Sequence, residues 1–110
     1  MIRLSSDNEN SSDIGSVVLE KEPDLKHPPS YQVILINDDF TPMEFVIQLL
    51  IEIFNRTTVQ AKEIMLTVHD KGKGVAGTYG LEIAEQKQQE ATMIARHHGH
   101  PLKVVIEKID

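Results

Sequence analysis

The feature that most constrains this chain is a short apolar strand. Acidic and amide residues follow it directly, and a helix comes next. Residues 31–36 read Tyr-Gln-Val-Ile-Leu-Ile, a β-branched and apolar run typical of a buried strand. Residues 37–39 read Asn-Asp-Asp, so three side chains with oxygen acceptors follow the strand. Met43 and Val46 come next on one face of the expected helix. The sequence therefore predicts an acidic lip beside an apolar surface, which suits a ligand with a cationic group next to a bulky apolar one.

The start of that helix carries its own signal. In Thr41-Pro42-Met43-Glu44, we expect Thr41 to be the N-cap and Pro42 to take the first helical position, where its missing N–H costs nothing. Glu44 stands where it closes a capping box with Thr41. These signals predict a helix over residues 42–54.

Composition limits the classes of protein that need considering. The 110 residues give room for one small domain, and 40% hydrophobic residues suffice for a core. There is no Cys, so disulfides and thiolate metal sites are excluded. The net charge of −6 argues against a nucleic-acid partner, and no apolar run is long enough to span a bilayer. We expect a cytoplasmic monomer without cofactor, bound metal or membrane partner.

The chain divides near Pro28-Pro29. Residues 1–29 hold one aliphatic cluster, Val17-Val18-Leu19, among Ser, Asn, Asp and Glu. Such a segment cannot bury enough apolar area to offset its ordering entropy, so we expect a disordered N-terminal tail. This tail is either a dispensable extension or an arm that engages a partner.

The remaining residues, 30–110, alternate between strands and helices. After the first strand and helix, we expect a second helix over 58–70, started by Thr57 or Thr58, and a strand over 75–79. A third helix over 81–98 ends at Gly99, and a last strand covers 102–109. The order β-α-α-β-α-β predicts a compact α+β domain, with a three-stranded antiparallel sheet packed against three helices.

Histidines are the other candidate site residues, and each has a structural alternative. His69 follows Val68 at the edge of the second helix's apolar face, where it either interacts with the helix dipole or points into a pocket. His97, His98 and His100 suggest zinc. However, Gly99 and Pro101 spread the three rings and no further ligand completes the set, so dipole interactions explain them better.

Two other patterns are weak. Residues 71–74, Lys-Gly-Lys-Gly, have the composition of a phosphate loop without its spacing, and they follow a helix instead of preceding one. Asp38, His69 and Thr41 resemble a hydrolytic set, but we assign Thr41 to the helix cap and find no oxyanion site. We therefore expect a protein without enzymatic activity.

Residues 33–46, Val-Ile-Leu-Ile-Asn-Asp-Asp-Phe-Thr-Pro-Met-Glu-Phe-Val, closely resemble the signature of ClpS, the adaptor that hands N-degron substrates to a Clp-family AAA+ unfoldase and its protease. The resemblance continues through residues 65–69, 77–79 and 82–85 and reaches His100-Pro101-Leu102. It covers residues 30–110. It implies that proteins with a free N-terminal Phe, Tyr, Trp or Leu are bound and delivered to a ClpA- or ClpC-type unfoldase for degradation by ClpP.

The resemblance also implies roles for individual residues. Asn37, Asp38 and His69 would bind the α-amino group of a peptide, and Asp39 and Thr41 would shape the pocket mouth. The cavity for the first side chain would be lined by Ile36, Met43, Val46, Met65, Val68 and Leu102. Glu82, Glu85 and Lys87 would contact the N-domain of the unfoldase.

Physical chemistry agrees with these roles. An ammonium group has three donors and no acceptor, so it needs several converging acceptors once it leaves water. The alternative function is a docking module of another machine, because the same architecture resembles the C-terminal domain of the ribosomal stalk protein. Fold alone does not separate the two. The acidic lip beside a cavity does, since a pure docking domain needs neither.

Overall fold

The computed structural model describes residues 29–109, so the predicted N-terminal tail lies almost entirely outside the described residues. The elements are β2 (Ser30–Ile36), α1 (Met43–Glu52), α2 (Thr58–Lys71), β3 (Lys73–Tyr79), α3 (Leu81–His97) and β4 (Lys103–Ile109). The predicted order of three strands and three helices is therefore confirmed. Within residues 29–109, no helix is long and apolar enough to cross a membrane.

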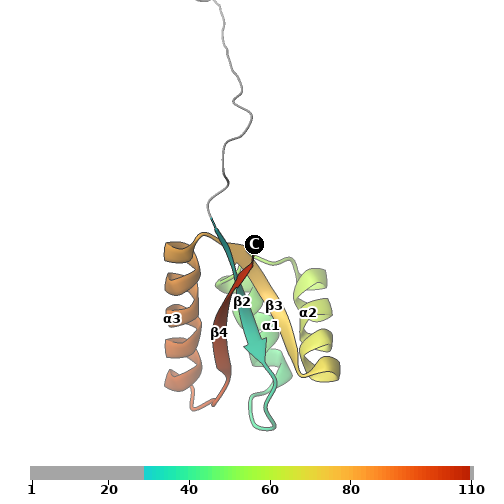
Figure 1. Ribbon diagram of the computed structural model, residues 1–110. Coiled ribbons are helices and arrows are strands. Elements are labelled where there is room, and N and C mark those ends of the chain that lie inside the picture. Colours follow the sequence, from blue (N-terminus) through green and yellow to red (C-terminus); the bar gives the residue numbers. More distant parts are fainter. Residues whose placement is uncertain (1–28, 110) are drawn as a thin grey trace, which may run out of the picture.

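The strands form one antiparallel sheet in the order β3-β2-β4, so the first strand of the domain lies in the centre. Val33 and Leu35 of β2 are fully buried and belong to the core shared with the helices. Because side chains alternate along a strand, Ile34 and Ile36 point to the other face of the sheet. Figure 1 shows α1 behind the sheet, with α2 on the side of β3 and α3 on the side of β4.

Each helix brings a different kind of side chain to the core. Helix α1 contributes large aliphatic residues, α2 contributes Met65 and Val68, and α3 contributes three fully buried alanines, Ala84, Ala91 and Ala95. Alanine allows a helix backbone to lie close to its neighbours. Helix α3 therefore packs closely along the sheet beside β4, which matters for the pocket described below.

The predicted cap of α1 is wrong. The N-cap residue is Pro42, in an extended conformation, and no side chain caps the helix. The Thr41 hydroxyl instead donates a 2.7 Å hydrogen bond to Oδ2 of Asp38. This hydrogen bond is charge-assisted and therefore strong, so it holds the Thr41 side chain against Asp38. Helix α1 consequently begins at Met43 and, at its other end, stops at Glu52, shorter than the predicted 42–54.

The other boundaries differ from prediction by one or two residues. Strand β3 begins at Lys73, earlier than the predicted residue 75, because Gly72 adopts a left-handed conformation with φ 89° and turns the chain directly from α2 into the sheet. The backbone N–H of Asn37 donates to the Gly72 carbonyl at 2.8 Å. This bond joins the end of β2 to the end of α2, close to the residues predicted to bind an α-amino group: Asn37, Asp38 and His69.

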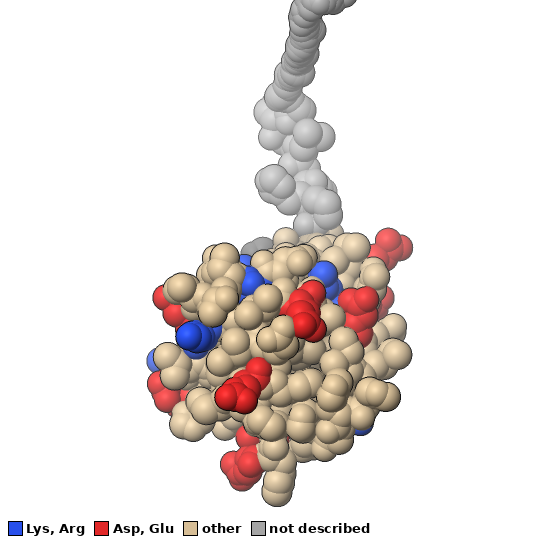
Figure 2. All heavy atoms as spheres, turned by 180° about the vertical axis from the view of Figure 1, so that it is seen from behind, with Lys and Arg blue, Asp and Glu red and all other residues tan. Residues whose placement is uncertain are grey.

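Figure 2 shows the molecule from behind. Charged side chains are scattered over this face of the described domain, among wider areas of uncharged residues, and the basic ones do not form a concentrated patch on it.

The start of α2 provides a test of local stability. Thr57, not Thr58, is the N-cap, and it forms a full capping box with Gln60. We expect Thr57→Ala to lower the free energy of unfolding by about 1 kcal/mol, since it leaves a helix N–H without its partner. Urea denaturation measures the difference. Thr58→Ala removes an equivalent hydroxyl one residue later and serves as the control; equal losses in the two variants would contradict the assignment.

Candidate functional site

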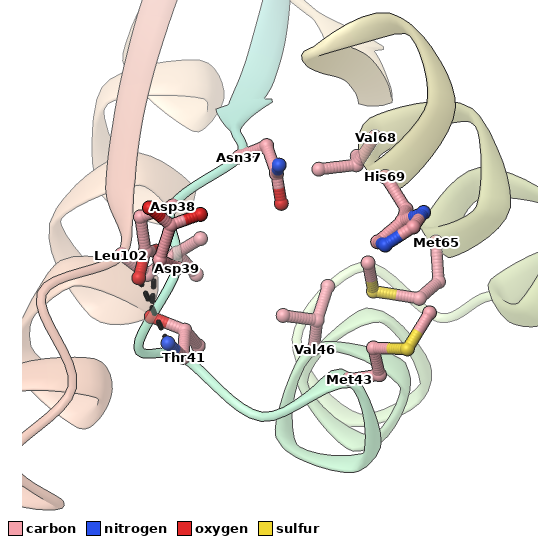
Figure 3. A pocket seen from close by; sticks show the side chains of 10 residues that line it. All are labelled: Asn37, Asp38, Asp39, Thr41, Met43, Val46, Met65, Val68, His69 and Leu102. Carbon is pink, nitrogen blue, oxygen red and sulfur yellow. Dashed lines mark hydrogen bonds between the residues drawn. The ribbon is translucent and has the colours of Figure 1, made fainter.

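A pocket with a volume of about 250 Å³ opens where the β2–α1 loop, α1, the end of α2 and the segment before β4 meet (Figure 3). Ten residues line it: Asn37, Asp38, Asp39, Thr41, Met43, Val46, Met65, Val68, His69 and Leu102. The sequence had indicated these ten and Ile36. Ile36 is not among the lining residues, because it points to the face of the sheet away from the helices.

The interior of the pocket is apolar. Val46, Met65, Val68 and Leu102 are at most 4% exposed and also belong to the hydrophobic core. They come from three separate segments that the fold brings together. Since the same side chains pack the core, their positions are fixed before any ligand arrives. Met43 differs from them: it is 42% exposed and stands at the entrance.

The polar residues lie at the rim. Figure 3 shows Asn37 with its amide directed toward the cavity, Asp38 and Thr41 on one side, and His69 on the opposite side beside Met65. Asn37, Asp39 and His69 are exposed, whereas Asp38 and Thr41 are partly buried. Acceptor groups therefore surround an apolar cavity.

Asp38 organises this rim. Its Oδ1 accepts hydrogen bonds from the backbone N–H groups of Phe40 and Thr41, both at 2.8 Å, and its Oδ2 accepts from the Thr41 hydroxyl. Burial by itself raises the pKa of Asp38, but these three hydrogen bonds and the nearby His100 ring outweigh it, so the pKa lies below its ordinary value. Asp38 is consequently a carboxylate at neutral pH.

The hydrogen bonds also limit what Asp38 can still accept. A carboxylate offers about four lone-pair sites, two on each oxygen. Both sites of Oδ1 are used, and Oδ2 keeps one after binding Thr41. Asp38 can thus offer one further hydrogen bond to a ligand, together with its full negative charge.

His69 supplies an acceptor from the other side. Its Nδ1 lies 3.4 Å from Oδ1 of Asp70, and a carboxylate can only accept. A hydrogen bond between them requires the proton on Nδ1, and in the neutral ring Nε2 is then the acceptor. The side chain is 58% exposed, so a ligand can reach it.

The residues expected to contact an unfoldase lie elsewhere, near the start of α3. Glu82 and Glu85 are exposed there. Lys87 is partly buried, and its Nζ donates a 2.7 Å hydrogen bond to the carbonyl of Ile53. Lys87 therefore ties α3 to the end of α1, a structural role that sequence reasoning missed because the acceptor is a backbone carbonyl 34 residues away.

Groups of three or more His, Asp or Glu side chains arranged to hold a metal ion do not occur among residues 29–109. His98 and His100 pack instead around Phe45, with ring centroids 5.5 and 4.5 Å from the Phe45 ring. Nδ1 of His98 lies 2.9 Å from the carbonyl of Ile94, one helical turn earlier. The cluster thus connects the end of α3 to α1.

The Asp38 network predicts a measurable acid titration. Because the folded protein lowers the pKa of Asp38, this group's contribution to stability is complete above the ordinary aspartate pKa and is lost as the pH falls through the lower folded value. Thr41→Val removes one donor and should raise the pKa of Asp38, as followed by the NMR shift of its carboxyl carbon. Thr41→Ser keeps the hydroxyl and should titrate like the parent. An unchanged Asp38 titration in Thr41→Val would show that the hydroxyl does not hold the carboxylate.

Comparison with known proteins places this geometry in a family. The family model "ATP-dependent Clp protease adaptor protein ClpS" matches residues 26–105. The chain is 46% identical over 109 residues to the ATP-dependent Clp protease adapter protein ClpS of Ruegeria pomeroyi, covering 99% of this chain and 96% of that protein. It is also 46% identical over 101 residues to the ClpS of Cupriavidus metallidurans, covering 92% and 94%.

A solved structure agrees with this result. The structure of Agrobacterium tumefaciens ClpS2 bound to L-phenylalaninamide matches with a TM-score of 0.73 and 36% identity, covering 76% of this chain and 100% of that one. The sequence, the fold and the relatives give one answer: this chain belongs to the ClpS family, the adaptor proteins of the ATP-dependent Clp protease.

Proposed function

We propose that the pocket binds the first residue of proteins that begin with Phe, Tyr, Trp or Leu and have a free α-amino group, and that the chain delivers them to a Clp unfoldase. The observation that carries this proposal is the combination in one pocket of a buried apolar interior and a rim of acceptors. L-phenylalaninamide, the ligand of the similar ClpS2 structure, has the same three parts as such a first residue: an ammonium group, an apolar side chain and an amide.

The rim accounts for the requirement for a free amine. The Asn37 amide oxygen, the remaining site on Asp38 Oδ2 and Nε2 of His69 together give three acceptors for three N–H donors. The charge of Asp38 adds attraction for a cation. An acetylated terminus has lost two donors and its charge, so it leaves these acceptors unpaired, which is costly in a partly desolvated site.

The interior accounts for the apolar first side chain. Burying a Phe or Leu side chain contributes about 1.5–3 kcal/mol, whereas a charged side chain placed among Val46, Met65 and Val68 has no partner there. Met43 restricts the shape at the entrance. Val and Ile carry two heavy atoms on Cβ, and we expect Met43 to contact that carbon and disfavour them.

The test uses short fluorescent peptides that differ only at the first position: Phe, acetyl-Phe, Arg and Val. We expect only the Phe peptide to bind tightly. Asn37→Ala should weaken it about tenfold or more, because charged hydrogen bonds contribute roughly 1.5–3 kcal/mol. Fluorescence anisotropy gives the dissociation constants. Gln89→Ala, which removes an exposed amide on α3, is the control and should bind like the parent. Equal affinity for the Phe and acetyl-Phe peptides would refute the amine site.

We further propose that the unfoldase partner is of the ClpA or ClpC type, acting with ClpP, and that its N-domain contacts the exposed start of α3. Glu82 and Glu85 are one helical turn apart, so they present two carboxylates on one face. Lys87 contributes its charge near this surface, although its Nζ is held by Ile53.

A mutation at the start of α3 should then weaken binding to the unfoldase without weakening binding of the peptide. We expect the double variant Glu82→Ala and Glu85→Ala to bind the Phe-first peptide normally and to lose at least about tenfold in affinity for the isolated N-domain, the loss that follows when truncation removes a contact important to the interface. Calorimetry measures both interactions. Glu90→Ala, later on the same helix, controls for the loss of negative charge. If the double variant binds the N-domain as tightly as the parent, the surface lies elsewhere.

A further inference from the structure

The turn between α3 and β4 is held by one arginine side chain. Nη1 of Arg96 donates to the carbonyl of His100 at 3.0 Å and to the carbonyl of Leu102 at 2.7 Å. Gly99, with φ 77°, reverses the chain, and the N–H of His100 donates to the Ala95 carbonyl at 2.8 Å. The backbone therefore turns sharply, and the arginine fixes the two residues that follow.

Side chains of α3 also form hydrogen bonds along the outer edge of the sheet. Strand β4 is an edge strand, so its outward carbonyls lack partners from another strand. The Leu102 carbonyl binds Arg96, and the Val104 carbonyl, two residues on, accepts a 3.0 Å bond from Nε2 of Gln88. Helix α3 thus covers this edge with two side chains, and Figure 1 shows α3 lying alongside β4.

Only one of the two bonds reaches the pocket. Leu102 is 1% exposed and lines the cavity, while Val104 belongs to the core but not to the pocket lining. Leu102 also lies outside β4, which begins at Lys103, so the sheet ladder does not hold it. The Arg96 bond to its carbonyl supplies a constraint at this point.

We propose that Arg96 is a positioning residue for the pocket: by holding the Leu102 carbonyl, it fixes the wall that limits which first side chains fit. This inference rests on the proposed function. Arg96 is exposed and is not among the residues that line the cavity, so it acts through Leu102. When the bond is absent, the Leu102 segment gains freedom and the wall yields to larger side chains.

The experiment measures selectivity in addition to affinity. Dissociation constants for Leu-first, Phe-first and Trp-first peptides are compared in the parent, Arg96→Met and Gln88→Met. Arg96→Met removes the bonds from α3 to the carbonyls of His100 and Leu102, and Gln88→Met removes the single bond to the carbonyl of Val104, so only Arg96→Met releases the pocket wall. We expect Arg96→Met to lower the ratio of the Trp to the Phe dissociation constant by about threefold to tenfold, the range that corresponds to one hydrogen bond of ordinary strength.

A general loss of stability changes all three constants by one common factor and leaves their ratios unchanged, which is the result expected for Gln88→Met. Arg96→Lys keeps a cationic donor and should restore the parent ratio at least in part. Ligand-free NMR provides a second readout, in which the Leu102 methyl signals should change in Arg96→Met and stay in place in Gln88→Met. Arg96→Gln has a shorter side chain with a neutral donor, so it should change the ratio and the Leu102 signals in the same direction but less. This variant tests the proposal if Arg96→Met does not fold.

Unchanged ratios together with unchanged Leu102 signals in folded Arg96 variants would overturn the positioning role. That outcome is distinct from failure of the proposed function, which shows as absence of Phe-peptide binding in the parent protein. If Gln88→Met alters the ratios as strongly as Arg96→Met, the whole strand edge sets the pocket and the specific assignment to Arg96 is wrong.

Discussion

The hydrogen bonds of Asp38 are the interaction on which the rest of the site depends. The chain must turn from the end of β2 into α1 within six residues, and three of the polar hydrogens in that turn point at one carboxylate. Pro42 has no N–H, and Thr41 directs its hydroxyl away from the helix, so the carboxylate replaces a conventional cap in ordering the entry to α1. Because these hydrogen bonds order the turn, they also fix the positions of Asn37 and Met43 on either side of it.

The same network explains how a negative charge is kept beside an apolar cavity. An isolated carboxylate near Leu102 and Val46 would tend to take up a proton, because desolvation disfavours its charged form. Two backbone N–H groups and one hydroxyl reverse that tendency and keep the pKa below its ordinary value. Hydrogen-bond donors in the same loop stabilise the charge at the rim. The attraction for a cationic ligand is therefore present before the ligand binds.

Much of this was predictable from the sequence, because the decisive signals are local. The alternation of strand and helix, the glycines that end α2 and α3, and the acceptors after β2 all lie in short windows. The cavity members from distant segments, such as Met65 and Leu102, came from the family resemblance. Two predictions differed from the structure. The Thr41 hydroxyl, expected to cap α1, donates to Asp38. Ile36, expected to line the cavity, is not among the lining residues, because side chains alternate along the strand. Lys87 and Arg96 bind backbone carbonyls, which every residue type has, so the sequence does not indicate these two interactions.

Helix α3 connects the two proposed activities. Its exposed start carries Glu82 and Glu85, and its end carries Arg96, which holds the wall of the pocket. At 1.5 Å per residue, the fourteen steps from Glu82 to Arg96 span about 21 Å. Figure 1 shows the β2–α1 loop at the same end of the domain as the end of α3, with the start of α3 at the opposite end. The pocket and the start of α3 therefore lie at opposite ends of the domain, so the two proposed contacts use separate surfaces.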